Sequence, residues 1–392
     1  MEDSQRKQKA VLFMSLYTEM GGAEYCLYHQ IKNLDRARYL PILLVNREGQ
    51  LTEKLRAQSV EIVVLPFPVV MLKSLIRPAV LGQVFAAARS IKRYIVNAEI
   101  DLIQCSDVLS LILLLPAIFA KPKRVVYSVV FFYELSRAVL FNLLAFLFVD
   151  RIVTDSCAVR EDLARKTVGL ASKMEVIYHC VDSEEFRPSA PVKKAETRKK
   201  LSIAPDKKLI GFIGRYEFWK GHRTFIEAAK LLLAQRGDLQ FLMVGGAMTA
   251  EVVPHIASYR REIIAMSAPL VENRSLLVFD HRDDIAEIMP ALDLFVCPSD
   301  AEAFGLVVLE AYACGIPVVA SKTVGALEIL GNAGGVYRAE PGDARSFAET
   351  ILAALQSSDG STDSETAREK ILQEYNWQEY ARRFEKVYDG MI

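Results

Sequence analysis

The stretch that decides the fold runs from residue 298 to residue 320 and reads PSDAEAFGLVVLEAYACGIPVVA. Its middle, residues 306–313, predicts a short helix. Gly315 suits the position just after the last turn of that helix, and Pro317 opens an apolar run that predicts a buried strand. A second apolar run, 293–297, precedes the stretch. The sequence therefore places a loop and a helix between two buried strands of one sheet.

The loop and the start of this helix hold two carboxylates. Glu302 lies on the loop, and Glu310 lies within the first turns of the helix. The backbone N–H groups of Phe304, Gly305 and Leu306 have no partner within the helix, and a glycine lets a ligand approach the backbone closely. A nucleotide sugar presents hydroxyls, a diphosphate and ribose hydroxyls in the matching order. Two isolated glutamates would more often be solvated, but the whole pattern favours a ligand site.

Outward from this stretch, short apolar runs alternate with helical patterns through most of the chain. Strands that are apolar on both faces and separated by helices predict parallel sheets covered by helices on each side. A polar, Pro-punctuated segment near residues 183–205 divides the runs into two groups, which predicts two domains of the α/β class. The expected strands are 11–15, 41–45, 61–65, 101–105, 124–130, 151–154 and 175–178 in the first half, and 209–213, 240–244, 276–279, 293–297 and 317–320 in the second.

The two halves begin alike. KAVLFMSLYTEMGGAE (9–24) and KLIGFIGRYEFWKGHRTFIEAA (208–229) each predict a strand, a loop and the start of a helix, where amide donors and the helix dipole hold an anion. Neither loop contains G-x-G-x-x-G, so a dinucleotide-dependent oxidoreductase is the least favoured class. Open parallel sheets bind ligands beyond the carboxyl ends of their strands. We therefore expect a ligand in a cleft between the two domains.

Composition and charge exclude several classes. The chain has 392 residues, and its 48 Lys and Arg balance its 48 Asp and Glu, so no net charge points to nucleic acid. The six cysteines are scattered singly, which favours reduced thiols over a disulfide scaffold or a zinc site. The N-terminus lacks a small-residue cleavage site, and the longest uncharged stretches are shorter than the roughly 18 to 20 residues of a spanning helix.

We therefore expect a cytoplasmic protein. Residues 131–149 are favoured as a helix buried against a sheet. A peripheral attachment to the inner face of a membrane, through 69–80 or 131–149, stays open.

The motifs resemble those of the retaining GT-B glycosyltransferases of family four, the group 1 glycosyltransferases. The resemblance covers almost the whole chain and is strongest over residues 208–330. HCVDSEEFRP (179–188) resembles the segment that closes the family's first domain. The other residues that carry it are GGAE (21–24), G-R-x4-K-G (214–221), VGG (244–246), FDHRDDI (279–285), EAFGLVVLE (302–310) and VGALEIL (324–330).

The resemblance implies two Rossmann-like parallel-sheet domains that face each other across a cleft, with the donor nucleotide held mainly by the second and the acceptor mainly by the first. Glu310 would bind the ribose hydroxyls, Glu302 a hydroxyl of the donor sugar, and the amides of residues 304–306 the sugar and diphosphate. His281 and Arg282 lie in a loop near the expected nucleobase and are placed among the donor-binding residues. For His281, contact with the base and simple exposure are both open.

Arg215 and Lys220 lie five residues apart on the second glycine loop. A guanidinium can hold a phosphate with two hydrogen bonds, and a lysine adds a mobile point charge. Cations at a departing diphosphate stabilise the transition state more than the ground state. We expect both side chains to converge there, with a solvated basic loop as the alternative. Gly21 and Gly22 of the first loop would let the backbone close over the donor, or would serve a tight turn.

One departure from the family concerns the first domain. Family members usually carry a histidine that faces the donor sugar, and Val130 occupies that position here. Tyr133 and Glu134 are the nearest polar groups that could substitute, with helix capping or a core role as the alternative. Asp107, at a strand end, is equally an acceptor-side group or a helix N-cap.

The sequence thus predicts an enzyme that transfers a sugar from a nucleoside diphosphate sugar to the hydroxyl of a sugar, glycolipid or small molecule, with retention, in polysaccharide, lipopolysaccharide or glycolipid assembly. Retention without an evident protein nucleophile implies attack from the leaving-group face, with the leaving phosphate accepting the proton. We expect no cofactor or metal, since no D-x-D follows a strand and Arg215 and Lys220 can supply the charge. Asp283 and Asp284 are interpreted as a helix cap.

The competing predictions are a non-catalytic nucleotide-sugar-binding protein and an epimerase or phosphorylase on the same fold. As domains we expect an N-terminal acceptor-side domain over 1–185, a linker over 186–205, a donor-binding domain over 206–365 and C-terminal helices over 366–392. The last of these helices, near 378–388, is expected to return to the first domain.

Overall fold

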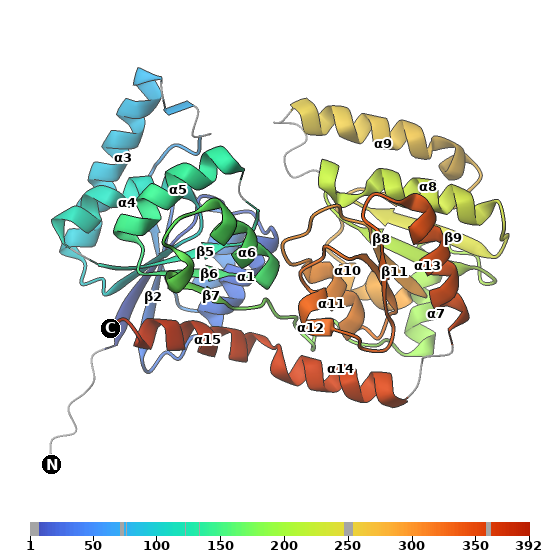
Figure 1. The fold of residues 1–392 in the computed structure, drawn as a ribbon. Helices are drawn as coiled ribbons and strands as arrows, with labels where there is room; N and C mark the ends of the chain where they lie inside the picture. The colour runs from blue at the N-terminus through green and yellow to red at the C-terminus, as the bar shows by residue number, and fades with distance from the viewer. Residues whose placement is uncertain are drawn as a thin grey trace, which may run out of the picture. The chain divides into compact units, whose positions relative to one another are not determined.

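The computed structural model describes residues 8–70, 74–75, 77–121, 123–132, 134–246, 254–357 and 362–392, which form two compact units (Figure 1). Unit 1 comprises the chain up to His179 together with Trp377–Ile392, and unit 2 comprises Cys180–Asn376. Each unit is an α/β body with its own parallel sheet, which confirms the predicted fold class.

The sheet of unit 1 has seven strands in the order β3-β2-β1-β4-β5-β6-β7. The central strands β1 and β4 are buried almost throughout, as expected for strands that are covered on both faces. All seven predicted strands are confirmed, with ends shifted by a residue or two. They are β1 (Lys9–Met14), β2 (Tyr39–Val45), β3 (Glu61–Val64), β4 (Leu102–Cys105), β5 (Arg124–Val129), β6 (Arg151–Thr154) and β7 (Met174–Val176).

Helices connect these strands, as parallel pairing requires. The predicted uncharged stretch 108–120 forms α4, which is buried over most of its length. Within the described residues, no helix is both long and apolar enough to cross a membrane. The helices of unit 1 are α1 (Gly22–Lys32), α2 (Gln50–Arg56), α3 (Pro78–Asn97), α4 (Val108–Ala120), α5 (Leu135–Phe148), α6 (Cys157–Lys166), the 3-10 turn η2 (Ala171–Lys173) and α15 (Trp377–Asp389).

Helix α5 corrects the prediction that residues 131–149 are buried. One face of the helix is in the core, where Ala138, Phe141 and Ala145 are fully buried. The other face is also apolar but lies at the surface, because both faces of α5 carry apolar residues and only one faces the sheet. Its exposed face consists of four side chains that are each more than half exposed, Val139, Leu143, Phe146 and Leu147.

The last helix, α15, belongs to unit 1, where the sequence analysis placed it. Its buried face carries polar as well as aromatic contacts. The Tyr388 hydroxyl donates to Gln104 Oε1 (2.5 Å) and accepts from Gln30 Nε2 (2.8 Å). The Trp377 ring stacks on His29 of α1, with ring centroids 4.5 Å apart. Buried polar groups need partners, so this network fixes the register of α15 on unit 1.

The sheet of unit 2 has six strands in the order β10-β9-β8-β11-β12-β13. The five predicted strands are confirmed. The sixth, β13, was not predicted, because its sequence VYRA is short, contains Arg338 and follows two glycines. The strands are β8 (Lys208–Ile213), β9 (Leu239–Val244), β10 (Leu276–Phe279), β11 (Leu294–Cys297), β12 (Val318–Ser321) and β13 (Val336–Ala339).

Strand β8 shows how the two faces of this sheet are covered. Ile210 and Phe212 point into the core that includes α8, α9 and α13. Gly211 faces the opposite way, and a Cβ there would lie 2.4 Å from the Leu292 side chain beside η4. The helices of unit 2 are α7 (Pro191–Lys200), η3 (Phe218–Lys220), α8 (His222–Leu233), α9 (Pro254–Glu272), α10 (Ile285–Ile288), η4 (Met289–Ala291), α11 (Leu306–Ala313), α12 (Leu327–Leu330), α13 (Ala344–Gln356) and α14 (Thr362–Glu374).

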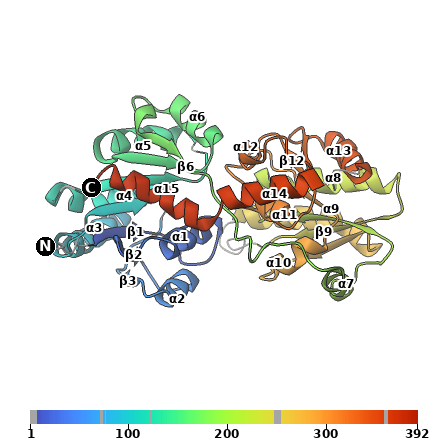
Figure 2. The same ribbon diagram turned by 90° about the horizontal axis from the view of Figure 1, so that it is seen from below.

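The unit boundaries differ from the predicted ranges. The segment 186–205, predicted as a linker, contains α7, which belongs to unit 2 and contacts η4 there. The predicted C-terminal region divides between the units. Helix α14 lies beside α11 in unit 2 (Figure 2), where Arg368 donates to the carbonyl of Ala313 (3.0 Å), while α15 belongs to unit 1.

Candidate functional site

The loops that leave the carboxyl edge of the unit-2 sheet pack against one another. Gly221 has a left-handed backbone (φ 78°), and a Cβ on it would lie 2.0 Å from the carbonyl oxygen of Pro298. The N–H of Asp300 donates to the carbonyl of Trp219 (2.8 Å). The loop after β8 is therefore docked on the loop after β11, and only glycine fits at residue 221.

The neighbouring loops are joined in the same way. A Cβ on Gly245 would lie 2.6 Å from the carbonyl oxygen of Gly214, and a Cβ on Gly246 would lie 2.6 Å from His281 Cβ. The VGG segment after β9 thus lies between the loop after β8 and the loop after β10. The glycine motifs of the sequence have a common cause, which is close backbone approach at one edge of the sheet.

Glu302 and Lys220 form an ion pair at the centre of this edge. Lys220 Nζ lies 2.5 Å from Glu302 Oε2, and the Ser299 hydroxyl donates to the same oxygen (3.2 Å). The Lys220 and Glu302 side chains are 18% and 13% exposed, so water screens the pair only partly. The sequence analysis selected both residues but gave them separate roles. It did not predict that they contact each other.

Helix α11 forms over the predicted residues 306–313, and Gly315 follows it with a left-handed backbone (φ 73°). Gly305 is its N-cap and is also left-handed (φ 88°). A Cβ at Gly305 would meet Val324 and Glu302 at 2.9 and 3.0 Å, so the fold itself requires this glycine. The first N–H groups of α11 have no acceptor within the helix, and they open beside Glu302.

Two further contacts close the helix start. Phe304 is buried, and its carbonyl accepts from the N–H of Ala326 (2.7 Å). The N–H of Gly325 donates to the carbonyl of Glu302 (3.2 Å). The VGALEIL segment after β12 therefore supports the loop that carries Glu302.

Glu310 occupies the middle of α11 and is half-buried. Burial raises the pKa of its carboxyl to about 8, and the negative charge of Glu185 contributes in the same direction. Within the described residues, no cation lies within ion-pair distance of this carboxylate. A buried carboxyl group without a charge partner is costly to ionise, and hydroxyl donors of a ligand would favour its ionised form.

Arg215 lies on the same edge but is not joined to Lys220. Its side chain is exposed, and no carboxylate among the described residues lies within ion-pair distance. The expected convergence of Arg215 and Lys220 on a diphosphate stays a prediction. Arg215 keeps its charge free, whereas Lys220 is held by Glu302.

His281 and Arg282 are paired within their own loop. His281 is 62% exposed and lies 3.1 Å from Asp283, and Arg282 makes two hydrogen bonds to Asp284 (2.7 and 2.5 Å). Asp284 stands at the N-cap position of α10, but its side chain caps no backbone N–H. The predicted cap is corrected on this point, because the carboxylate is used by Arg282 instead.

Three of the candidate residues of unit 1 lie at the starts of helices. Gly21 is the N-cap of α1 with φ −101°, and Gly22 is the first residue of α1; neither has a left-handed backbone, so a left-handed tight turn does not explain them. Asp107 caps α4 by accepting from the Ser110 N–H (2.7 Å). Burial raises the pKa of Asp107 to about 6, although hydrogen bonds from Ser110 act to lower it. The helix-cap interpretation of Asp107 is confirmed.

Glu134 is exposed at the N-cap position of α5 and makes no side-chain cap. Tyr133 lies outside the described residues. Val130 lines a cavity of about 40 Å³ together with Glu24, Gln104 and His179. The role of Glu134 as a substitute for the family histidine stays a prediction.

Sequence reasoning missed His222, the first residue of α8. Its ring is fully buried and stacks on Tyr216 (centroids 4.9 Å apart) and against Phe212 (4.7 Å). Burial lowers the pKa of His222 to about 3, so the imidazole is neutral at pH 7 and acts as an aromatic spacer beneath the loop. The only signal in the sequence is its place directly after Lys220 and Gly221.

No group of three or more His, Cys, Asp or Glu side chains arranged to hold a metal ion occurs among the described residues. The predicted independence of metals remains a prediction.

The strand order 3-2-1-4-5-6 of unit 2, with glycine loops and a helix N-terminus at its carboxyl edge, defines a Rossmann-like nucleotide-binding unit. With a second such unit in the same chain, the class is the GT-B fold. The chain belongs to the family-four, or group 1, glycosyltransferases. "Glycosyl transferases group 1" matches residues 193–384, and "Glycosyltransferase Family 4" matches residues 20–185.

Two curated relatives illustrate the sequence similarity. The lipopolysaccharide core biosynthesis mannosyltransferase LpsB of Rhizobium meliloti (strain 1021) is 39% identical over 157 residues, 40% of this chain and 42% of that protein. The alpha-maltose-1-phosphate synthase of Mycobacterium tuberculosis is 28% identical over 257 residues, 62% of this chain and 64% of that protein. In both cases the match spans less than two thirds of the relative.

Solved structures share the fold over nearly the whole chain. Anabaena Alr3699/HepE in complex with UDP and glucose has a TM-score of 0.81 at 22% identity and covers 97% of this chain and 99% of its own. Sucrose-phosphate synthase from Thermosynechococcus elongatus has a TM-score of 0.79 at 18% identity and covers 98% and 99%. At this identity the likeness shows the fold alone.

Proposed function

We propose that this chain is a glycosyltransferase that moves a sugar from a nucleoside diphosphate sugar to an acceptor hydroxyl. The observation that carries the proposal is the arrangement at the carboxyl edge of the unit-2 sheet. There Glu302, the N-terminus of α11 and Glu310, which has no ion-pair partner among the described residues, follow one another along one loop and helix, and Lys220 of the loop after β8 pairs with Glu302. Membership of the family supports the same activity.

In the proposed donor complex, Glu310 accepts from the ribose hydroxyls and the first amides of α11 donate to the diphosphate. Glu302 accepts from a hydroxyl of the donor sugar, and Lys220 turns from Glu302 toward the diphosphate. Arg215 has no ion-pair partner among the described residues, which leaves its guanidinium able to hold the same group. His281 and Arg282 lie on the loop next to the expected nucleobase.

We propose that transfer proceeds with retention, by attack of the acceptor from the face that the diphosphate leaves. The C–O bond to the leaving phosphate breaks, the bond to the acceptor oxygen forms, and the proton of the acceptor hydroxyl passes to a leaving phosphate oxygen. Lys220 and Arg215 stabilise the negative charge that develops on that phosphate. Proton NMR of the product formed from an α-linked donor tests this, since a β-linked product would contradict retention.

The acceptor side is proposed to be unit 1, with Asp107, Tyr133 and Glu134 as candidate contacts and with a sugar, glycolipid or small molecule as acceptor. Polysaccharide, lipopolysaccharide or glycolipid assembly is the proposed context. It is supported by LpsB, whose name places that relative in lipopolysaccharide core biosynthesis.

A ligand panel tests the proposed activity. Thermal unfolding is followed with UDP, GDP, ADP and their glucose, galactose or mannose esters, and the stabilising donor is then incubated with sugar and lipid acceptors. At a hundredfold excess over its dissociation constant, a ligand adds about 2.7 kcal/mol of stability. Stabilisation by one nucleoside diphosphate sugar and its consumption only when acceptor is present are expected. No stabilisation by any donor would refute the proposal.

A non-catalytic binding protein is the second candidate, because Val130 stands where the family carries a histidine. Such a protein would bind the donor and never consume it. An epimerase would convert the donor sugar without acceptor, and a phosphorylase would need inorganic phosphate. The panel separates these outcomes.

We also propose that transfer needs no divalent ion, because Lys220 and Arg215 can supply the positive charge that a metal supplies elsewhere. Turnover in the presence of EDTA should equal turnover in buffer containing Mg²⁺ or Mn²⁺. A loss of activity that Mg²⁺ or Mn²⁺ restores would contradict the proposal.

Finally, we propose a cytoplasmic protein whose unit 1 attaches to the inner face of the membrane through α5. The exposed residues Val139, Leu143, Phe146 and Leu147 follow one another at i, i+4, i+7 and i+8, which makes a continuous apolar strip. Lys173 Nζ lies 5.8 Å from the centre of the Phe146 ring, so a cation adjoins the strip.

Lys121 and Arg151 are also exposed near the ends of α4 and α5. Four side chains are far fewer than the roughly 20 to 30 residues per partner of a standard interface, whereas apolar side chains beside cations suit anionic lipid headgroups. Cosedimentation with phosphatidylglycerol vesicles should be lost in Leu143→Glu/Phe146→Glu and kept in Val192→Glu of unit 2. If the chain is a dimer in solution and the double variant is a monomer, the strip binds a second copy of the chain instead of a membrane.

A further inference from the structure

A cavity of about 1000 Å³ lies at the amino edge of the unit-2 sheet. It is lined by α7, by the segment that leads to β8, and by the turns that precede β9 and β10. The loops that carry Glu302 and Lys220, and helix α11 with Glu310, lie at the carboxyl edge of the same sheet, so the cavity is separate from the proposed donor site. Its volume is at the upper end of the range typical of small-molecule sites.

The charge of the lining is one-sided. Six of the described residues that line the cavity are cations, and none of the described lining residues is Asp or Glu. The six are Lys194, Arg198, Lys199, Lys207, Arg236 and Arg274. Carboxylates just outside the lining compensate part of this charge, so the unpaired cations decide what the cavity attracts.

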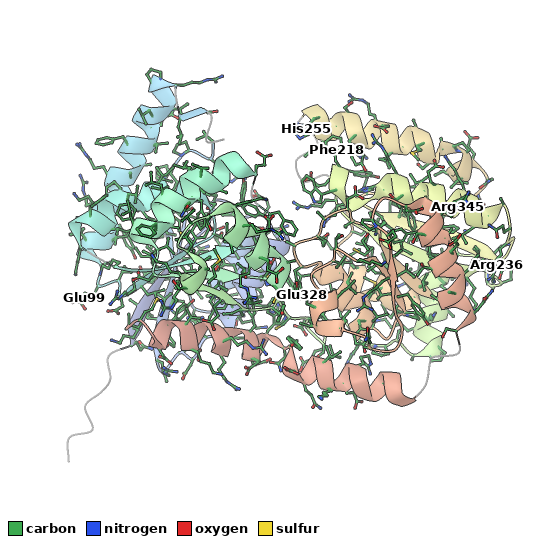
Figure 3. All side chains as sticks on the ribbon, viewed as in Figure 1. Glu99, Phe218, Arg236, His255, Glu328 and Arg345 are labelled. Atoms are coloured by element: carbon green, nitrogen blue, oxygen red, sulfur yellow. The ribbon has the colours of Figure 1, made fainter. Side chains whose placement is uncertain are left out.

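Three of these cations are hydrogen-bonded to carboxylates outside the lining, and Lys207 Nζ lies 4.0 Å from the carboxylate of Asp206. Asp293 binds Arg198 (2.5 Å) and Lys194 (3.3 Å), and Asp238 accepts two hydrogen bonds from Arg236 (2.9 and 2.5 Å). Figure 3 labels Arg236, on the turn before β9. The side chains of Lys194, Arg198 and Arg236 are therefore positioned before any ligand arrives, which lowers the entropy cost of binding.

Lys199 and Arg274 differ from these three. Both side chains are exposed, and within the described residues no carboxylate lies within ion-pair distance of either. Their charges are uncompensated and stand at the same cavity from two different segments, α7 and the turn before β10. A negatively charged group is the complement that both would share.

Burial and neighbouring positive charges act on Lys194. Burial lowers the pKa of Lys194, and the positive charges of Arg198 and Lys208 lower it further, while Asp293 acts in the opposite direction. An anion in the cavity would relieve this repulsion.

Between the cations the wall has apolar as well as neutral polar parts. Pro191, Ile203 and Leu239 line it between the cations. The buried side chain of Gln240 ties two walls together, because its Oε1 accepts from the Ala204 N–H (3.1 Å) and its Nε2 donates to the Arg274 carbonyl (3.0 Å). A ligand for this cavity therefore needs an apolar or planar body as well as negative charge.

We propose that this cavity binds a small phosphorylated metabolite, with one or two phosphate groups on Lys199, Arg274 and the cations beside them and with its organic body on the apolar wall. The inference goes beyond the proposed glycosyl transfer and does not depend on it. Phosphate is the anion that several convergent Lys and Arg side chains suit best.

Calorimetry and thermal unfolding of the full chain test the proposal, with inorganic pyrophosphate, glucose 6-phosphate and AMP as probes and adenosine as the uncharged comparison. At least one phosphorylated probe should bind, and adenosine should bind at least tenfold more weakly than AMP. Lys199→Ala/Arg274→Ala should weaken the binding phosphate ester about tenfold or more, as the loss of charged hydrogen bonds does. Lys200→Ala/Arg345→Ala removes the same two charges outside the cavity and should leave binding unchanged.

Two further experiments test which site binds the phosphate and whether a soluble ester or a lipid headgroup carries it. In Glu310→Ala, which disables the proposed donor site, the phosphorylated probe should bind as it does to the unchanged chain. Equal loss in both double variants, loss in Glu310→Ala, or no binding of any phosphorylated probe overturns the proposal. Binding to phosphatidylglycerol vesicles without binding of the soluble esters overturns it too, in favour of a lipid headgroup.

Discussion

The two edges of the unit-2 sheet both carry cations, but the backbone around them differs. At the carboxyl edge, α8 and α11 begin, so amide donors with a positive dipole end face outward. At the amino edge, α8 and α9 end, and cations there meet backbone carbonyls, as Lys207 does with Gly237 and Arg198 with Ala291 (2.9 Å). The direction of the strands therefore sets which groups are available at each edge.

The pairing of the cations differs as well. At the carboxyl edge, the partner of Lys220 is Glu302, a residue that is itself proposed to bind the donor. At the amino edge, the partners of Lys194, Arg198 and Arg236 are Asp293 and Asp238, which belong to no proposed site. A cation whose partner must also bind substrate can change partner during a reaction. A cation held by a structural carboxylate keeps a fixed position, with its remaining N–H donors available to a ligand.

Among the substitutions that test the two edges, Lys220→Ala should have the largest effect, a fall in kcat. If Lys220 stabilises the departing diphosphate, its loss should lower kcat by about a hundredfold to a thousandfold, as the removal of one preorganised donor does. The affinity for the free nucleoside should change little. Single-turnover kinetics and calorimetry with the nucleoside separate the two quantities.

Lys230→Ala is the matched control, because Lys230 forms a surface ion pair with Glu227 on α8 and should leave kcat unchanged. Removal of Lys220 also leaves Glu302 unpaired, so circular dichroism must show that the variant is folded. A folded Lys220→Ala variant with normal kcat would mean that Lys220 only holds Glu302 in place.

Glu310→Ala should weaken binding of the donor nucleoside diphosphate roughly ten- to a hundredfold, since the lost charged hydrogen bonds are worth about 1.5 to 3 kcal/mol. Glu349→Ala, an exposed glutamate of α13, controls for a general change of charge. Calorimetry gives both affinities. Equal affinity in Glu310→Ala and the unchanged chain would remove the ribose contact from the proposal.

Alanine substitutions at two glycines, one at each edge, compare how tightly the backbone is packed there. Gly221→Ala puts a Cβ 2.0 Å from a carbonyl oxygen at a residue with φ 78°. Strain of about 1 to 3 kcal/mol should lower Tm by several degrees. Gly237→Ala, at the amino edge, adds a Cβ with no atom within 4 Å and should leave Tm unchanged or slightly raised. Scanning calorimetry measures both, and equal Tm values would show that the loop after β8 can move.

Local patterns predicted much of this edge. The helix over 306–313, the loop position of Glu302 and the special backbone at Gly305 follow from spacing of a few residues, and the structure has all three. The strands were predictable because each is a short apolar run between turn residues. β13 lacks that signal, since Arg338 and Tyr337 interrupt it.

Contacts between distant segments were not predictable. Lys220 and Glu302 are 82 residues apart, and no spacing rule connects them. The exposed face of α5 was missed because an apolar pattern on both faces does not say which face the sheet covers. The amino-edge cavity was missed for the same reason, as its cations come from segments that lie together only in the folded unit.

The smallest expected effect concerns pH. In the folded chain the pKa of Glu310 is about 8, well above its ordinary value of 4.5, so between these values the folded state holds a proton that the unfolded state has lost. The free energy of unfolding then falls as pH rises through this range. Glu310→Gln keeps the shape of the neutral side chain and removes this contribution to the pH dependence of the free energy of unfolding. Its Tm should equal that of the unchanged chain near pH 4.5 and exceed it by about a few degrees above pH 8.

Donor binding should show the opposite trend with pH. Ribose hydroxyls donate to the ionised carboxylate, so nucleotide binding must release the Glu310 proton, and affinity should rise between pH 7 and about 8 in the unchanged chain. In Glu310→Gln the affinity should be weaker and flat over the same interval. Parallel pH profiles of Tm for the two proteins would mean that Glu310 is ionised in the free chain, and its contact with ribose would then need no proton release.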